Sequence, residues 1–163
     1  MKKSLIMIGL IAIFILLDNT IAPLIAVEGY YPSFVFVFVI CYSIIQGEND
    51  ALKVGIFSGV MQDIYFFNGF GINCITNLLV CILAAYIGKN IFKDKKLIPI
   101  ASVFALTFLK STLIYVLLFI FKIYINPYKI IFISLYNMVV SILMYHYVYR
   151  LCSKSYMVKE WKF

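Results

Sequence analysis

The sequence predicts an all-α integral membrane protein: one transmembrane domain over residues 1–163, folded as a compact bundle of six helices. Hydrophobic residues make up 64% of the chain and the mean hydropathy is +1.02, whereas about half of a soluble domain is apolar. The chain also divides into six apolar stretches separated by polar breaks. A helix needs roughly 20 residues to cross a hydrocarbon core ~30 Å thick, so six helices leave no room for a soluble domain.

The six spans are predicted in order from the breaks between them. Lys2 and Lys3 before the first apolar stretch resemble the start of a signal peptide, but no good cleavage site follows, so the first span is expected to stay uncleaved. In the third break, Asn68-Gly69 is a strong turn signal, and Pro127 cannot continue the fifth helix. The predicted spans are about 4–26, 30–46, 51–67, 71–91, 97–121 and 128–150.

The third predicted span is the least regular. It is short, carries Lys53 and Asp63, and contains Gly55 and Gly59. Two alternatives stay open, a tilted crossing and an incomplete one. Backbone that leaves the helix at membrane depth has to be covered by protein or line a cavity.

The distribution of Lys and Arg predicts the orientation, because membrane proteins keep these residues on the cytoplasmic side. With the N-terminus inside, the outer side receives only Lys122 and Lys129, and Lys110 falls within a span. We therefore expect both termini in the cytoplasm and a multi-pass protein of the bacterial cytoplasmic (inner) membrane. The inner side then receives Lys2, Lys3, Lys53, Lys89, Lys93, Lys95, Lys96, Arg150, Lys154, Lys159 and Lys162.

Three charged residues fall inside predicted spans and form the candidate polar cluster: Asp18, Asp63 and Lys110. Such residues are costly in lipid and usually face the bundle interior. At ~1.5 Å per residue, their depths from the inner side are ~21, ~18 and ~20 Å. We therefore hypothesise that Lys110 pairs with Asp18, Asp63 or both. The cluster would hold helices in register or form a polar pocket or ion path, unless both aspartates sit at outer helix ends.

Small and amide residues provide the other candidates. Gly55 and Gly59 have the spacing of a small-residue face, which permits close helix approach either within the chain or with another membrane protein. Asn73, Asn77 and Asn137 are expected to make helix–helix hydrogen bonds.

No feature predicts catalysis, a metal or a cofactor. The sequence lacks the zinc-type, serine-hydrolase and phosphate-binding motifs, and no cysteine pair has metal-ligand spacing. The net charge of +7 follows the topology, and no basic surface domain exists to bind nucleic acid. We expect neither an enzyme nor a nucleic-acid partner.

The stretch from Gly55 to Asn77 resembles the rod shape-determining protein MreD family. It reads Gly55-Ile-Phe-Ser-Gly59-Val-Met-Gln-Asp63, then Asn-Gly69-Phe-Gly71-Ile72-Asn73. The family pattern is a Gly-spaced helix that ends in Gly-x-x-x-Asp, then a Gly-rich turn and another span. Ile72 stands where Leu is common, while Pro32 at the start of the second span also fits. The motif covers about 25 residues, and the architecture covers most of the chain.

The resemblance implies a non-enzymatic scaffold of the machinery for lateral wall growth. The partner would be MreC, whose large domain faces outward, and through it MreB filaments, the RodA glycosyltransferase and a class B penicillin-binding transpeptidase. Its implied fold is similar to the substrate-binding subunits of energy-coupling-factor transporters. The Gly55/Gly59 face is then a candidate contact for the single transmembrane helix of MreC, and Asp63 is the acid of the family pattern.

A vitamin-transport subunit of the energy-coupling-factor type is the alternative reading. It would share the size, the spans and the fold, and Asp18, Asp63 and Lys110 lie at a plausible depth for its ligand pocket. Such subunits usually carry an Ala-x-x-x-Ala coupling face on the first helix, and here only Ala22 and Ala26 have that spacing, near the outer end.

Overall fold

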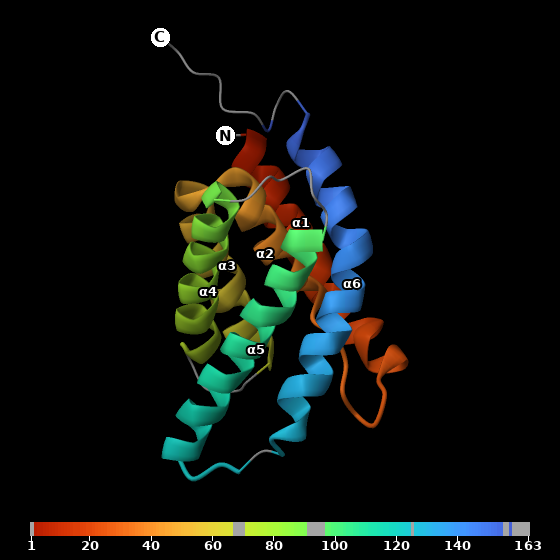
Figure 1. The fold of residues 1–163 in the computed structure, drawn as a ribbon, viewed down its shortest axis with the longest axis vertical. Coiled ribbons are helices and arrows are strands. Elements are labelled where there is room, and N and C mark those ends of the chain that lie inside the picture. The colour runs from red at the N-terminus through yellow and green to blue at the C-terminus, as the bar shows by residue number, and fades with distance from the viewer. Residues whose placement is uncertain (1, 67–70, 91–96, 125, 155–156, 158–163) are drawn as a thin grey trace.

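The computed structural model describes residues 2–66, 71–90, 97–124, 126–154 and 157 as a helical bundle (Figure 1). The described part holds six α-helices and a 3-10 turn and no strand, so the predicted all-α class is confirmed. Four helices, α1, α4, α5 and α6, are long and apolar enough to cross a membrane. The elements are α1 (Lys2–Thr20), η1 (Ala22–Ile25), α2 (Phe34–Gln46), α3 (Glu48–Phe66), α4 (Ile72–Asn90), α5 (Leu97–Ile120) and α6 (Tyr128–Cys152).

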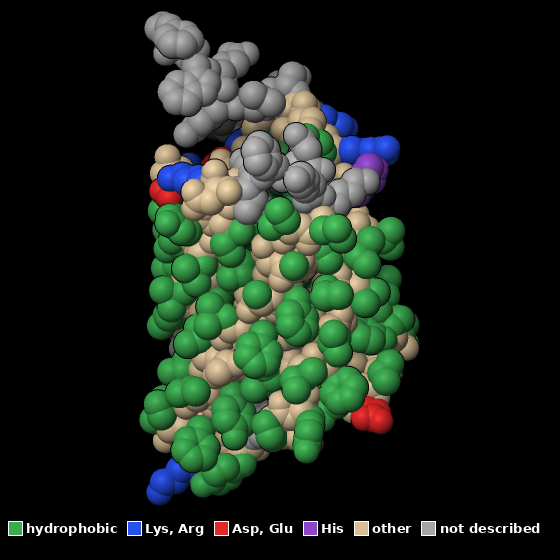
Figure 2. Space-filling model, viewed as in Figure 1, with side chains coloured by type: hydrophobic (Ala, Val, Ile, Leu, Met, Phe, Trp, Pro, Cys, Tyr) green, Lys and Arg blue, Asp and Glu red, His purple; other side chains and the backbone are tan. Residues whose placement is uncertain are grey.

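The two ends of the bundle differ in charge. The start of α1 and the end of α6 lie at one end, which we call the termini end (Figure 1). The other end, the loop end, carries segments 26–33 and 121–124. Most Lys and Arg side chains visible in Figure 2 gather near the termini end, and apolar side chains cover the surface between the ends. An apolar belt between two polar ends suits a bilayer. Which end faces the cytoplasm remains a prediction from the distribution of charge.

α2 is the central helix of the bundle. Every residue from Val35 to Ile44 is buried, and α2 contacts each of the other five α-helices. A helix that is apolar all round belongs in such a position. Its 13 residues reach only about 20 Å, less than the hydrocarbon thickness. Because protein rather than lipid surrounds it, α2 does not have to match that thickness. Six complete membrane crossings therefore remain a prediction.

The predicted first span, 4–26, is wrong at its end, because α1 stops at Thr20. The side chains of Asn19 and Thr20 bond back to helix carbonyls, at 3.0 and 2.8 Å. Pro23 then has no N–H to continue the helical hydrogen bonds, and the chain turns through η1. Hydropathy alone did not detect this stop, because residues 21–27 are apolar.

The predicted second span, 30–46, is wrong at its start. Val27 and Tyr30 form an isolated backbone bridge, and α2 begins only at Phe34. Ser33 is its N-cap, because the side-chain oxygen accepts a hydrogen bond from Phe36 N at 3.3 Å, a typical way to satisfy a free N–H at a helix start.

The break between the second and third predicted spans is confirmed at Gly47, whose φ of 91° ends α2. α3 starts at Glu48, before the predicted 51, and acidic residues suit the first turn of a helix. Several sequence predictions fall outside the described residues: the turn at Asn68 and Gly69, and the basic residues Lys93, Lys95, Lys96, Lys159 and Lys162.

Candidate functional site

Lys110 of α5 reaches the inside of the bundle and meets neutral acceptors. The side chain is buried, with 8% exposed. Its ammonium donates hydrogen bonds to Asn77 Oδ1 at 2.6 Å and Gln62 Oε1 at 3.3 Å. The ring of Phe36 lies 4.3 Å away, a distance at which an aromatic face attracts a cation. Lys110 therefore links α5 to α2, α3 and α4.

Asp18 of α1 binds the start of α2. One carboxylate oxygen accepts a hydrogen bond from Phe34 N at 2.5 Å, and the other accepts from Ser33 Oγ at 2.9 Å and Val35 N at 3.4 Å. A carboxylate at this position satisfies free N–H groups and favours the positive end of the helix dipole. The charge of Asp18 is thus stabilised by the α2 backbone.

Asp63 of α3 plays the same part for α4. It accepts hydrogen bonds from the backbone N–H groups of Gly71, Asn73 and Cys74, at 3.0, 2.9 and 3.0 Å. Gly71 has a φ of 95°, a conformation that favours glycine. The acid and the glycine of the motif together therefore shape the turn into α4.

Neutral side chains connect these charged residues. Gln62 Nε2 donates to Ser33 Oγ at 3.3 Å, and Ser33 N donates to Asn137 Oδ1 of α6 at 2.9 Å. Asn77 Nδ2 donates to Gln62 Oε1 at 2.9 Å and to Ser58 Oγ at 3.2 Å. We call this set the polar network; its members are Asp18, Ser33, Ser58, Gln62, Asn77, Lys110 and Asn137.

The structure brings Asp18 and Lys110 into one network, while Asp63 stands beside it as a separate cap. The hypothesis of a direct ion pair is wrong, because neither carboxylate lies within ion-pair distance of Lys110; the ion pairs among described residues are Lys3–Asp50 and Lys89–Glu48. The expected amide bonds between helices are present for Asn77, and Asn137 bonds to the N-cap of α2. Asn73 contributes its backbone N–H.

Sequence reasoning missed Ser33 and Gln62, which connect the network. Ser58 and Gln62 are four residues apart and share one face of α3, and this spacing of polar side chains in an apolar stretch was a usable signal. Ser33 was visible as an N-cap residue directly before an apolar run.

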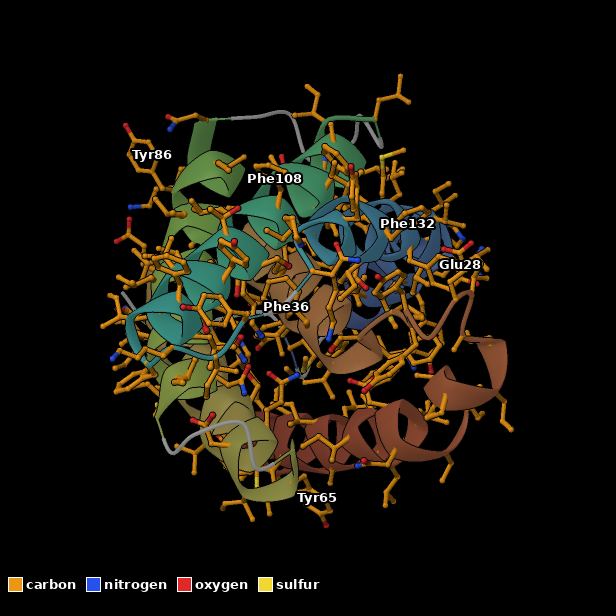
Figure 3. The ribbon with its side chains drawn as sticks, turned by 90° about the horizontal axis from the view of Figure 1, so that it is seen from below. Glu28, Phe36, Tyr65, Tyr86, Phe108 and Phe132 are labelled. Atoms are coloured by element: carbon orange, nitrogen blue, oxygen red, sulfur yellow. The ribbon has the colours of Figure 1, made fainter. Side chains whose placement is uncertain are left out.

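A cavity of about 250 Å³ lies between the polar network and the loop end. Asp18 and Lys110 line it together with Tyr30, Tyr115 and Lys129. Figure 3 looks into the bundle from this end and shows Phe36, which also lines the cavity, near the centre. The cavity thus combines aromatic walls with a buried cation that has two hydrogen-bond acceptors for three N–H donors.

The Gly55/Gly59 face is occupied by α4. A Cβ added at Gly59 would lie 2.7 Å from Asn73 O and 2.8 Å from Cys74 N, and one at Gly55 would lie 3.2 Å from Asn77 O. Both glycines are buried. This face joins α3 to α4 and is not free for a partner helix. The expectation that the Gly55/Gly59 face contacts MreC is therefore wrong.

The described residues hold no group of three His, Cys, Asp or Glu placed to bind a metal ion. The bundle defines a class: a helical membrane protein whose buried polar groups bond to one another beside a cavity. The chain matches the family of the rod shape-determining protein MreD over residues 1–155, and it belongs to that family. The family supports a role in rod shape determination.

Neither a curated protein nor a solved structure matches the chain. The similarity of the bundle to energy-coupling-factor subunits is therefore not shown, and the transport-subunit alternative has no support from the family match.

Proposed function

We propose that this protein is a non-enzymatic scaffold of the bacterial cytoplasmic membrane that binds MreC and so supports lateral peptidoglycan synthesis. Through MreC it would act together with MreB filaments, RodA and a class B penicillin-binding transpeptidase. Membership in the MreD family supports the role in cell shape. The observation that carries the partner proposal is the cavity at the loop end, with Lys110 at its wall.

The predicted orientation supports this proposal, because it puts the cavity on the side where MreC would have its large domain. In the predicted orientation the loop end faces outward, because the termini end holds most of the basic residues. A partner segment that leaves the membrane beside the bundle on that side can reach the cavity, whose lining includes Tyr30 and Lys129. Tyrosines provide apolar contact area together with a polar tip, and carbonyl or carboxylate oxygens of an entering segment suit the ammonium of Lys110.

The polar network gives this cavity a fixed shape. Asp18 ties α1 to the start of α2, Asn137 ties α6 to the same point, and Lys110 ties α5 to α3 and α4. A site held in its binding conformation before the partner arrives loses less conformational entropy on binding. This suits a scaffold, whose task is to hold a partner in one arrangement.

The test is co-purification from the protein's own cells in a mild detergent, with the recovered proteins and small molecules identified by mass spectrometry. Ser111→Trp places a large ring in the cavity, because Ser111 lines it. Leu109→Trp is the matched control, two residues away on α5 and 37% exposed outside the cavity. We expect the wild type and Leu109→Trp to recover MreC and the Ser111→Trp variant to lose it.

Two results would contradict the proposal at different levels. Recovery of MreC by a folded Ser111→Trp variant would show that MreC binds outside the cavity, while the scaffold function would still stand. Recovery from the wild type of a vitamin and paired ATPases, without MreC or wall synthases, would overturn the scaffold function itself.

A further inference from the structure

A second hollow lies between α1 and α3 near the termini end, away from the polar network. Its volume is about 420 Å³, within the ~300–1,000 Å³ range of small-molecule sites. α1 and α3 lie side by side here (Figure 3). We call this hollow the α1–α3 groove. It is polar toward the termini end, with Lys3, Asp50 and Lys53, and apolar toward the bundle middle, with Ile11, Val54 and Phe57.

The polar part of the α1–α3 groove carries an unbalanced positive charge. Lys3 donates to Asp50 Oδ2 at 2.7 Å and to Gln46 Oε1 at 2.9 Å, so the aspartate is already paired. Lys53 is exposed and has no hydrogen bond or ion pair with a described residue. An anionic group at this position would complement the groove.

A tyrosine hydroxyl also faces the groove. Tyr42 is only 1% exposed and lines the α1–α3 groove. Its ring lies 6.2 Å from that of Phe38, but its hydroxyl makes no hydrogen bond with a described residue. No fully buried side-chain N or O atom among the described residues lacks a hydrogen-bond partner. The unbonded Tyr42 hydroxyl is therefore open to the groove, where an acceptor from outside the chain can reach it.

We infer that the α1–α3 groove binds one anionic phospholipid, with its phosphate between Lys53 and the Tyr42 hydroxyl and an acyl chain along Ile11, Val54 and Phe57. The whole groove extends about 12 Å along α1 from Lys3 to Ile11, and its apolar half lies toward the apolar belt of the bundle, where an acyl chain belongs. Basic pockets between membrane helices are known to select anionic headgroups. This site is separate from the proposed MreC contact, which lies at the loop end.

Native mass spectrometry of the full chain, purified in mild detergent, tests this inference. The probes are phosphatidylglycerol and phosphatidylcholine with identical acyl chains. We expect one phosphatidylglycerol to stay bound under activation that removes phosphatidylcholine. The Lys53→Gln variant should lower the ratio of retained phosphatidylglycerol to phosphatidylcholine about fivefold, as expected for one lysine near an anionic headgroup.

Arg150→Gln is the matched control, because Arg150 is exposed on α6 at the same end and bonds to no described side chain. It removes the same charge and should keep the wild-type ratio. Tyr42→Phe removes only the hydroxyl, and should lower retention of both lipids, since both carry a phosphate. Equal retention of the two lipids by the wild type, or equal effects of Lys53→Gln and Arg150→Gln, would overturn the inference.

Discussion

At the scale of single residues, the two buried aspartates bond to the starts of helices rather than to the buried lysine. Asp18 and Asp63 each accept hydrogen bonds from the first backbone N–H groups of a following helix. Depth estimates from the sequence placed the three charges at similar height, but height along a helix does not fix the direction of a side chain. The sequence therefore predicted which charged residues are buried, but the aspartates predicted as partners of Lys110 were wrong.

Asp63→Asn should strongly destabilise the bundle. The asparagine keeps one acceptor oxygen and presents an NH₂ group where the carboxylate meets three N–H groups. Since each hydrogen bond to a charged group contributes about 1.5–3 kcal/mol, we expect a loss of about 3 kcal/mol. Thermal unfolding in detergent, followed by helical circular dichroism, measures it.

Glu48→Gln is the control for Asp63→Asn, because Glu48 pairs with Lys89 at the exposed surface, with 46% of its side chain accessible. Such surface pairs contribute about 0–1 kcal/mol. If both variants lost the same stability, the cap assigned to Asp63 would be wrong.

Lys110→Met should have a modest effect on folding, although it removes a buried charge. Asn77 Oδ1 loses its donor, at a cost of about 1–3 kcal/mol, and the removal of an ion without a carboxylate contact offsets part of that cost. We expect folded yield within about twofold of the wild type in size-exclusion chromatography. Loss of all folded protein would indicate a direct ion pair, since breaking a buried pair costs about 3–5 kcal/mol.

At the scale of helices, the sequence predicted which segments are helical far better than where the first two end. The breaks at Gly47 and Pro127 were readable because glycine and proline act locally. The end of α1 and the start of α2 instead depend on Asp18 meeting the backbone at Phe34, 16 residues away. Hydropathy cannot report such a contact, and so it extended both spans through the apolar turn.

The contact between α3 and α4 predicts a graded series of Gly→Ala variants. At Gly59 the added methyl group would meet the α4 backbone, so the helices must move apart. At Gly55 its neighbours lie at 3.2 Å, and at Gly9 nothing lies within 4 Å. We expect severe loss of stability for Gly59→Ala, a smaller loss for Gly55→Ala, and a gain of up to about 1 kcal/mol for Gly9→Ala from helix propensity.

Thermal unfolding in one detergent ranks the three variants. The order is the informative result, because all three changes add the same methyl group to a helix. A Gly59→Ala protein as stable as Gly9→Ala would show that α3 and α4 are not in this close contact.

At the scale of the whole molecule, the two proposed binding sites lie at opposite ends of the bundle. The loop end carries the cavity and the polar network, and the termini end carries the basic residues and the α1–α3 groove. The proposed partner and the proposed lipid therefore approach from opposite ends. The MreC proposal depends on the orientation, which is predicted from the distribution of charge rather than from the fold.

The orientation predicts which ends react with a reagent that does not cross membranes. In intact cells, an impermeant maleimide should label Lys122→Cys, whose position is exposed at the loop end, and should leave Lys89→Cys at the termini end unlabelled. After the membrane is permeabilised, both should react. The wild type gives the background, since Cys41, Cys81 and Cys152 are buried and Cys74 is half-buried. Labelling of Lys89→Cys but not Lys122→Cys in intact cells would invert the orientation, placing the cavity in the cytoplasm, where the outward domain of MreC cannot reach it.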